Sequence, residues 1–459
     1  MTHAERLAAF VVRAGYDDLS EEARRQLKIR VLDSLGCAIG ALQGEPIALL
    51  RSQLADFDGS VQCTLIGGGR SAPDRAALYN SALVRYLDFN DSYLAQGETC
   101  HPSDNLGAVL AAAEYAQRSG KDFLTALAAA YQVQCRLSEV APVRAKGFDH
   151  TTQGSYALAA GISKALGLDQ AQTANAIAIC GTAFNALRVT RTGRLSQWKG
   201  LAYPNTAFCC THATFLAMRG VTGPLEVFEG DKGFIDAIAG PFEIDRSQEN
   251  LERVTRTILK KYNAEIHSQT TLEGILELRQ QHNLAAEQIE RVEVETFSVA
   301  YNIIGGGEEG DKTIVESKEQ ADHSLPYMVA VALLDGQVMP AQYRVERIKS
   351  PDVQDLLRKV KVRPAEAFSR RFPEEMPCRI TVALRDGRTY SKEKRDYEGF
   401  VTRPIRWESV VEKFEKLSRP YASPALQREL IAAVDNLENL QVSDLTGLLA
   451  QVGLGAPAA

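Results

Sequence analysis

The sequence lacks the motifs of several large functional classes. None of its eight cysteines forms a C-x-x-C pair, so no zinc ribbon or iron–sulfur cluster with that spacing is indicated. Neither a Walker A motif nor the G-x-S-x-G elbow of α/β-hydrolases occurs. We therefore expect chemistry that rests on the protein's own side chains, with no cofactor and no metal.

A strong excess of one charge is also missing. The formal net charge is −6, and no dense cluster of Lys and Arg would follow a phosphate backbone, so we expect no nucleic-acid partner. No uncharged apolar run is long enough to span a bilayer, and the first twenty residues lack the apolar core of a secretion signal. We expect a cytoplasmic protein without a membrane partner.

The chain has 459 residues, which is too long for one ordinary core. Helical periodicity runs from residue 3 to about 245 and returns after 399. Alternating apolar residues at 289–301, 360–364 and 378–396 indicate strands, with Asp386-Gly387 as a hairpin turn. These patterns predict a mainly α protein with helical parts at 1–254 and 399–459 and a smaller α+β domain at 255–398.

One polar stretch stands between two segments typical of buried helices. Residues 88–105 read "DFNDSYLAQGETCHPSDN", whereas the flanking segments are rich in Ala and Leu. A solvated connection is the simple explanation. A polar insert between packed helices also suits the wall of a cavity, and we favour that interpretation because loops often carry function.

Four of the seven histidines precede or begin helical segments, namely His101, His150, His267 and His323. A histidine near a helix end is often structural. Helix N-termini that converge on one cleft would instead suit an anionic ligand.

A second cluster gathers cations at 185–206, "NALRVTRTGRLSQWKGLAYPNT", with Arg188, Arg191, Arg194 and Lys199. A solvated cationic face is one interpretation. The other is a carboxylate receptor, because guanidinium groups bind carboxylates through two hydrogen bonds.

A metal site is a weaker alternative for the polar stretch. Asp88, Asp91, His101 and Asp104 are oxygen and nitrogen donors, but neither H-E-x-x-H nor a cysteine set accompanies them.

Four stretches resemble the MmgE/PrpD family in order and spacing. They are "YLDFNDSYLAQGETCHPSDNLGAVLAAAEY", "RAKGFDHTTQGSYALAAGISKALGL", "YNAEIHSQT" and "ADHSLPYMVAVALLDGQ". The resemblance covers almost the whole chain. It implies a large all-helical domain built from both chain ends, a smaller α+β lid domain, a cleft between them, a homodimer, and catalysis without an iron–sulfur cluster.

The resemblance also assigns site residues. It implies catalytic roles for Asp88, His101, His150, Lys199, His267 and Tyr327. It implies substrate binding by Ser92, Glu265 and Gln269, to which the carboxylate receptor adds Arg188 and Arg191.

The reactions of the family are dehydration of 2-methylcitrate, decarboxylation of cis-aconitate and epimerisation of iminodisuccinate. The motifs "HPSDNLG" and "AEIHSQT" look most like the dehydratases, so dehydration of a small polycarboxylate is the first expectation. The run Tyr262-Asn263-Ala264-Glu265 departs from the dehydratase pattern, and Lys199 fits the decarboxylase pattern better, so decarboxylation and epimerisation stay open.

The expected mechanism is acid–base catalysis by His101 and His150, with Asp88 orienting one imidazole and cations stabilising an aci-carboxylate. His267 and Tyr327 are expected to complete the site from the lid. A non-catalytic helical dimer that binds a small acid is the alternative from another class.

Overall fold

The computed structural model describes residues 1–57, 61–193, 195–244 and 249–453. The protein is mainly helical with a small sheet in its C-terminal region, which confirms the predicted fold class at that level. The chain divides into two compact units. Unit 1 contains Met1–Arg191, Gln197–Thr257 and Arg406–Ala459, and unit 2 contains Thr192–Ser196 and Ile258–Ile405. The predicted division into one helical domain, made of residues 1–254 and 399–459, and an α+β domain of residues 255–398 stays a prediction.

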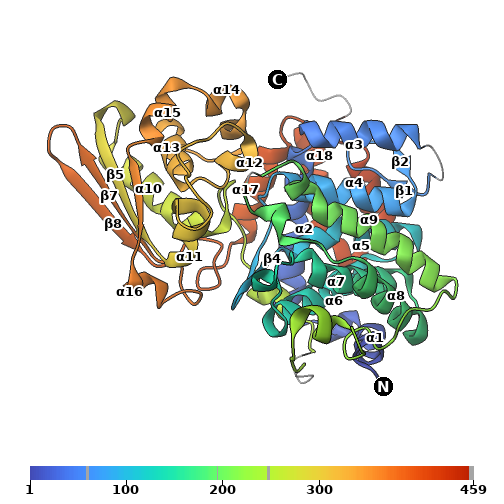
Figure 1. The fold of residues 1–459 in the computed structure, drawn as a ribbon. Coiled ribbons are helices and arrows are strands. Elements are labelled where there is room, and N and C mark those ends of the chain that lie inside the picture. Colours follow the sequence, from blue (N-terminus) through green and yellow to red (C-terminus); the bar gives the residue numbers. More distant parts are fainter. Residues whose placement is uncertain (58–60, 194, 245–248, 454–459) are drawn as a thin grey trace. The chain divides into compact units, whose positions relative to one another are not determined.

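Unit 1 is built from helices of both chain ends (Figure 1). The longer ones are α1 (His3–Arg13), α2 (Glu21–Gly40), α3 (Glu45–Asp56), α4 (Pro73–Tyr86), α5 (Leu106–Tyr115), α6 (Gly120–Val140), α7 (Thr151–Leu166), α8 (Gln170–Ala183), α9 (Trp198–Met218), α17 (Trp407–Ser418), α18 (Pro424–Asp435) and α19 (Val442–Leu449). Two short hairpins, β1 (Cys63–Thr64) with β2 (Arg70–Ser71) and β3 (Tyr93–Ala95) with β4 (Glu98–Cys100), connect them.

Local sequence signals explain where these helices begin. The Ser20 hydroxyl accepts a hydrogen bond from the Ala23 N–H at 3.0 Å and so caps α2. The Ser119 hydroxyl caps α6 by accepting a hydrogen bond from the Asp122 N–H, and the Asp122 carboxylate accepts one from the Ser119 N–H. Such caps satisfy N–H groups that have no partner within the helix.

Small residues let the central helices of unit 1 approach closely. A Cβ on Gly107 of α5 would lie 2.4 Å from the backbone nitrogen of Ser81 in α4, so no larger residue fits there. Glycine at this position therefore allows α4 and α5 to pack closely.

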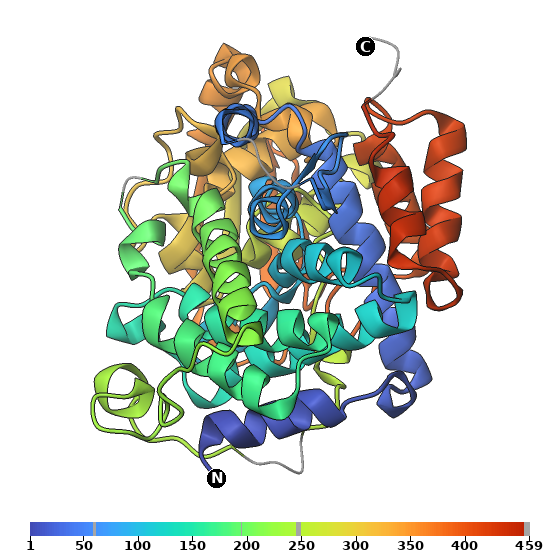
Figure 2. The same ribbon diagram turned by 90° about the vertical axis from the view of Figure 1, so that its right-hand side faces the viewer.

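The C-terminal helices complete unit 1 by packing on its N-terminal part. Figure 2 shows α17–α19, in red, beside the blue helix α2, and α17 contacts α2. Buried Lys413 of α17 lies 2.6 Å from the Asp33 carboxylate of α2 and donates to the Phe89 carbonyl at 2.7 Å. Residues far apart in sequence thus hold the polar stretch that begins at Asp88.

Unit 2 contains a four-stranded sheet in the order β6-β5-β7-β8, formed by β5 (Ile289–Thr296), β6 (Val360–Pro364), β7 (Cys378–Leu384) and β8 (Thr389–Lys394). Strand β5 is parallel to β6 and antiparallel to β7, and β7 and β8 form a hairpin. Gly387 in the turn has φ of +88°, which confirms the predicted hairpin turn. The first strand is shorter than predicted, because the Ser298 N–H bonds the Ser369 hydroxyl and the chain enters a helical turn.

Helices α10 (Gln269–His282), α13 (Leu325–Asp335) and α15 (Pro351–Leu357) pack in the core of unit 2, and α10 and α13 contact the sheet (Figure 1). Shorter helices α11 (Ser298–Ala300), α12 (Lys318–Ala321), α14 (Val345–Ile348) and α16 (Glu366–Ser369) connect the larger elements. Alternate residues of β5 and β7 face this core.

Among the described residues, no helix combines the length and apolar character needed to cross a membrane.

The buried Lys413–Asp33 pair predicts a measurable stability difference. Lys413→Ala should lower the free energy of unfolding by about 3 kcal/mol, because the substitution leaves a buried carboxylate without its cation. Lys416→Ala on the same helix is the control. Lys416 and Glu412 form an exposed pair, for which the expected loss is about 0.5 kcal/mol. Urea unfolding measures both, and equal losses would contradict the structural role of Lys413.

Candidate active site

Asp88 follows α4 with a positive φ of +54°, which Asp tolerates better than most residues. Its carboxylate lies 2.6 Å from the Arg85 guanidinium and 3.1 Å from the Lys199 Nζ. All three side chains are buried. The structure therefore brings the predicted residues Asp88 and Lys199 together. It also pairs Asp88 with Arg85, which the sequence interpretation missed. The predicted link of Asp88 to an imidazole stays a prediction.

Asp91 anchors the middle of the polar stretch. Its Oδ1 accepts bonds from the Ser103 hydroxyl at 2.6 Å and the Ser103 N–H at 3.0 Å, and its Oδ2 accepts from the Tyr131 hydroxyl at 2.7 Å. Because Asp91 and its partners are buried, these bonds fix the backbone of the stretch.

The backbone of Asp91 orients His101. The His101 Nδ1 lies 2.7 Å from the Asp91 carbonyl oxygen and 3.1 Å from the Ser92 hydroxyl. A carbonyl only accepts hydrogen bonds, so Nδ1 must carry a proton. In the neutral ring, Nε2 then holds the free electron pair, which makes it the atom able to accept a proton.

The second predicted histidine lies beside the first. The ring centroids of His101 and His150 are 5.4 Å apart, and Tyr203 of α9 stacks on His150 at 5.8 Å. Gly154 makes room for this stack, since a Cβ there would come within 2.5 Å of the Tyr203 ring. Among the described residues, neither ring nitrogen of buried His150 has a hydrogen-bond partner. The Nε2 lies 3.8 Å from the Asp149 carboxylate, beyond hydrogen-bond distance.

Burial and nearby cations lower the pKa of His150 to about 3, although the Asp149 carboxylate acts in the opposite direction. The cations are Arg191, Arg85 and Arg188. His150 is therefore neutral near pH 7 and can donate or accept one hydrogen bond.

Arg188 and Arg191, the arginines predicted to bind a substrate carboxylate, lie close to a carboxylate of the protein itself. Arg191 contacts Asp149 at 2.5 Å through Nε and at 3.3 Å through Nη2, and Arg188 lies 3.9 Å from the same carboxylate. Burial would raise the pKa of Asp149, but these arginines and His150 hold it well below its usual range. Arg194, the third arginine of the predicted cluster, lies outside the described residues.

Asp104 completes the buried polar network. It accepts a bond from the Asn90 amide at 2.8 Å and lies 3.6 Å from the Arg85 Nε. Burial raises the pKa of Asp104 to about 7, against the effect of Arg85 and Arg191. The sequence interpretation considered Asp104 only as a metal ligand.

The suggested metal set is not assembled in the described residues. Asp91 is bound by Ser103 and Tyr131, Asp104 by Asn90, and the His101 Nδ1 by a carbonyl. These four predicted donors do not converge on one point for a cation.

Unit 2 carries its own imidazole–carboxylate pair. The His267 Nδ1 donates to Glu265 at 2.7 Å, and the Glu265 carboxylate also accepts the His267 N–H at 2.8 Å. Burial alone would raise the pKa of Glu265, but His267, His323 and Lys260 lower it to about 2. The His267 Nε2 has no hydrogen-bond partner among the residues described, so this pair is a second candidate for proton transfer.

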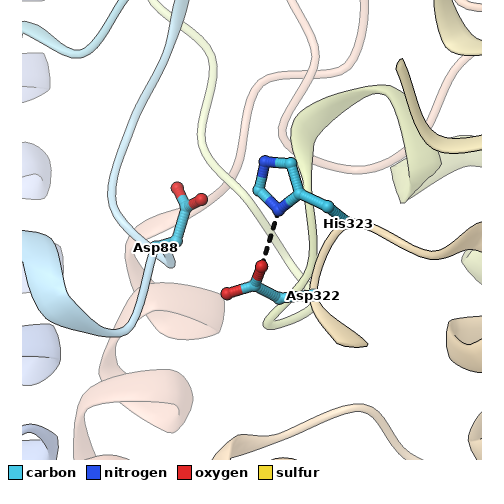
Figure 3. A group of neighbouring side chains, drawn as sticks. All are labelled: Asp88, Asp322 and His323. Carbon is cyan, nitrogen blue, oxygen red and sulfur yellow. Dashed lines mark hydrogen bonds and ion pairs between the residues drawn. The ribbon is translucent and has the colours of Figure 1, made fainter. Parts of the chain in front are cut away.

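A similar pair follows in the chain. The His323 Nδ1 lies 2.6 Å from Asp322 (Figure 3), and the backbone N–H of Glu265 donates to the Asp322 carbonyl at 3.1 Å. Two imidazole–carboxylate pairs are therefore neighbours within unit 2. The sequence named His323 but gave it no role, and the adjacent Asp322 was the available signal.

Two predicted site residues of unit 2 have their polar atoms in structural bonds. The Gln269 amide accepts from the N–H groups of Lys261 and Tyr262 and donates to the Tyr262 and Ala264 carbonyls. The hydroxyl of Tyr327 donates to the Gln342 carbonyl within the core. These bonds favour structural roles for Gln269 and Tyr327. The predicted roles of Gln269 in substrate binding and of Tyr327 in catalysis stay predictions.

Sequence signals existed for some of the residues that were missed. Arg85 stands three residues before Asp88, which is ion-pair spacing on a helix end. Asp149 directly precedes His150. Asn90 and Tyr203 gave no such signal, because only the fold brings them to the site.

The lowered pKa of His150 predicts acid sensitivity. An unfolded histidine takes up a proton near pH 6.5, but folded His150 does so only near pH 3, so its contribution to stability is lost as pH falls through this window. The Tm of the wild type minus that of His150→Gln should therefore fall between pH 7 and pH 4. Scanning calorimetry measures the difference, and His212→Gln, at an exposed histidine, is the control. A wild-type advantage that grows on acidification would contradict this.

Comparison with known proteins adds the family. The MmgE/PrpD N-terminal domain matches residues 5–247 and the MmgE/PrpD C-terminal domain matches residues 262–439. The chain is 28% identical to 2-methylcitrate dehydratase of Salmonella typhi over 94% of each chain. It is 27% identical to cis-aconitate decarboxylase of Mus musculus, over 94% of this chain and 90% of the other. Because the two domain matches cover most of the sequence, the protein belongs to the MmgE/PrpD family.

Proposed function

We propose that the protein is a lyase that removes water from a small polycarboxylate such as 2-methylcitrate or citrate, without a cofactor. The observation that carries this proposal is the pair of buried imidazoles, His101 and His150, beside the Arg85–Asp88–Lys199 group of unit 1. Relatives named 2-methylcitrate dehydratase, at 26 to 28% identity, support the reaction class.

Dehydration begins with removal of a proton from a carbon next to a carboxylate, and this C–H group is a weak acid. Removing its proton builds a second negative charge on that carboxylate, so the site must stabilise an aci-carboxylate. Lys199 and Arg188 are the cations that we assign to this charge. Lys199 is buried and therefore acts strongly, because little water screens it.

We assign His101 as the base, because its bond to the Asp91 carbonyl leaves Nε2 as the accepting atom. As the C–H proton moves to Nε2, its electron pair moves onto the carboxylate and gives the aci-carboxylate. The pair then forms the alkene as the C–O bond breaks, and protonated His101 gives its proton to the leaving hydroxyl, which departs as water. Neutral His150 has a ring N–H with which to bond the charged intermediate.

A decarboxylase is the second candidate. The observation that favours it is Lys199, which lies on Asp88 in a buried pair, and a relative named cis-aconitate decarboxylase matches over 94% of this chain. Epimerisation of a dicarboxylic acid would use the same carbanion. A homodimer, a cytoplasmic location and the parts of His267 and Tyr327 in the reaction remain predictions.

Product analysis distinguishes these reactions. Chelator-treated protein is incubated with 2-methylcitrate, citrate and cis-aconitate while alkene absorbance and carbon dioxide are followed together. We expect absorbance to rise with 2-methylcitrate or citrate and no gas to form. Gas from cis-aconitate would replace the dehydratase proposal with a decarboxylase, and no change with any of the three acids would contradict both.

The acid–base assignment predicts loss of turnover in two variants. His101→Ala and His150→Ala should each lower kcat by about 100-fold or more, because each removes a group that moves or bonds a proton. Circular dichroism checks that the fold persists, and His212→Ala serves as the control at an exposed histidine. Near-normal turnover in both variants would refute the assignment.

A further inference from the structure

Arg191 contacts two of the segments that carry the proposed chemistry. Its Nε and Nη2 bind the Asp149 carboxylate, and its Nη1 lies 3.3 Å from the Lys199 carbonyl oxygen. We propose that Arg191 is a positioning residue that holds the His150 and Lys199 segments in register, and that it is not a ligand for the substrate carboxylate. The inference rests on the proposed function, because it gives His150 and Lys199 their roles.

The backbone around Arg191 is paired with the segment before His150. The Asp149 N–H donates to the Ala186 carbonyl and the Arg188 N–H donates to the Gly147 carbonyl, both at 2.9 Å. Phe148 and Leu187 form an antiparallel bridge between these bonds. This backbone pairing places the side chains of Arg188 and Arg191 near Asp149. It also keeps the two segments together when one of these side chains is changed.

The Asp149 carboxylate also bonds the first turn of α7. Its Oδ1 accepts the Thr151 N–H at 3.2 Å, and the Asp149 carbonyl accepts the Thr152 N–H at 3.0 Å. His150 is the N-cap residue of the same helix. A movement of the Asp149 carboxylate would therefore move the start of α7 and the imidazole with it.

The guanidinium of Arg191 is already used by the protein. Its side chain is only 9% exposed, and Asp149 is fully buried. A substrate carboxylate would have to displace Asp149 and leave that carboxylate buried without its partner, which is unfavourable. Arg191 is thus better suited to holding the site than to binding substrate.

Arg188 offers an internal comparison on the same helical turn. It lies 3.9 Å from Asp149, beyond hydrogen-bond distance, and its side chain is 18% exposed. We keep Arg188 as a cation for the substrate. The two arginines should therefore give opposite kinetic signatures.

The kinetic test compares Arg191→Met with Arg188→Met on the acid that the protein turns over. Arg191→Met should lower kcat by about 10-fold or more and change KM by less than about threefold, because misplaced groups slow the chemical step. Arg188→Met should raise KM by about 10-fold or more. Arg191→Lys keeps the charge but loses the fork of donors, so it should restore kcat only in part.

A second measurement needs no substrate. NMR titration of His150 reads the charges around its ring, which come from Asp149, Arg191, Arg85 and Arg188. The rings of His101 and Tyr203 also lie beside it. Loss of the Arg191 charge should raise the pKa of His150 in Arg191→Met, because that cation opposes protonation of the ring. A purely structural arginine elsewhere would leave this titration unchanged.

The outcomes separate the two proposals. A lower kcat with a shifted His150 titration supports the positioning role, whereas a raised KM with an unmoved titration overturns it. If no acid is turned over, the proposed function fails, and an unmoved His150 titration would still overturn the positioning role. If Arg191→Met does not fold, Arg191→Lys decides by kinetics alone: a lower kcat with little change in KM supports the positioning role, and a raised KM with an unchanged kcat overturns it.

Discussion

The proposed chemistry depends on one hydrogen bond, from the His101 Nδ1 to the Asp91 carbonyl. This bond sets which ring nitrogen carries the proton and where the other one points. It is secure only because the Asp91 side chain is held by Ser103 and Tyr131 in a buried network. A loop with freely moving backbone would leave the imidazole without a fixed tautomer.

Around this bond, buried charges are arranged in pairs. Asp88 lies between Arg85 and Lys199, and Asp149 accepts Arg191. Each pair contributes little net stability after desolvation, so stability alone does not explain why unit 1 buries so many of them. Their value lies in fixed electrostatics, because a site that must stabilise a second negative charge needs oriented cations before the substrate arrives.

Local patterns predicted the features that depend on neighbours in sequence. The turn at Asp386-Gly387 and the mainly helical class with a small C-terminal sheet follow from such patterns, and the structure confirms them. The sequence also brought forward His101, His150 and Lys199, which lie within one buried region of unit 1. Their chemical roles remain the proposal made above.

Other features depend on backbone atoms and distant contacts, which no motif reveals. No local pattern indicates that the Asp91 carbonyl orients His101, that Asp149 binds Arg191, or that Lys413 donates to the distant Phe89 carbonyl. For Gln269, the residue type suggested a substrate ligand, whereas its amide makes four bonds to the nearby backbone. Side-chain type indicated the chemistry available, and only the fold shows which groups are already engaged.

The most direct test of the account is the tautomer of His101, read by nitrogen-15 NMR of ring-labelled histidine with His101→Gln to assign its signals. The account predicts a protonated Nδ1 and an unprotonated Nε2 in the resting protein near neutral pH. A neutral ring with the proton on Nε2 would contradict it, because that nitrogen would then have no electron pair with which to take a proton from the substrate.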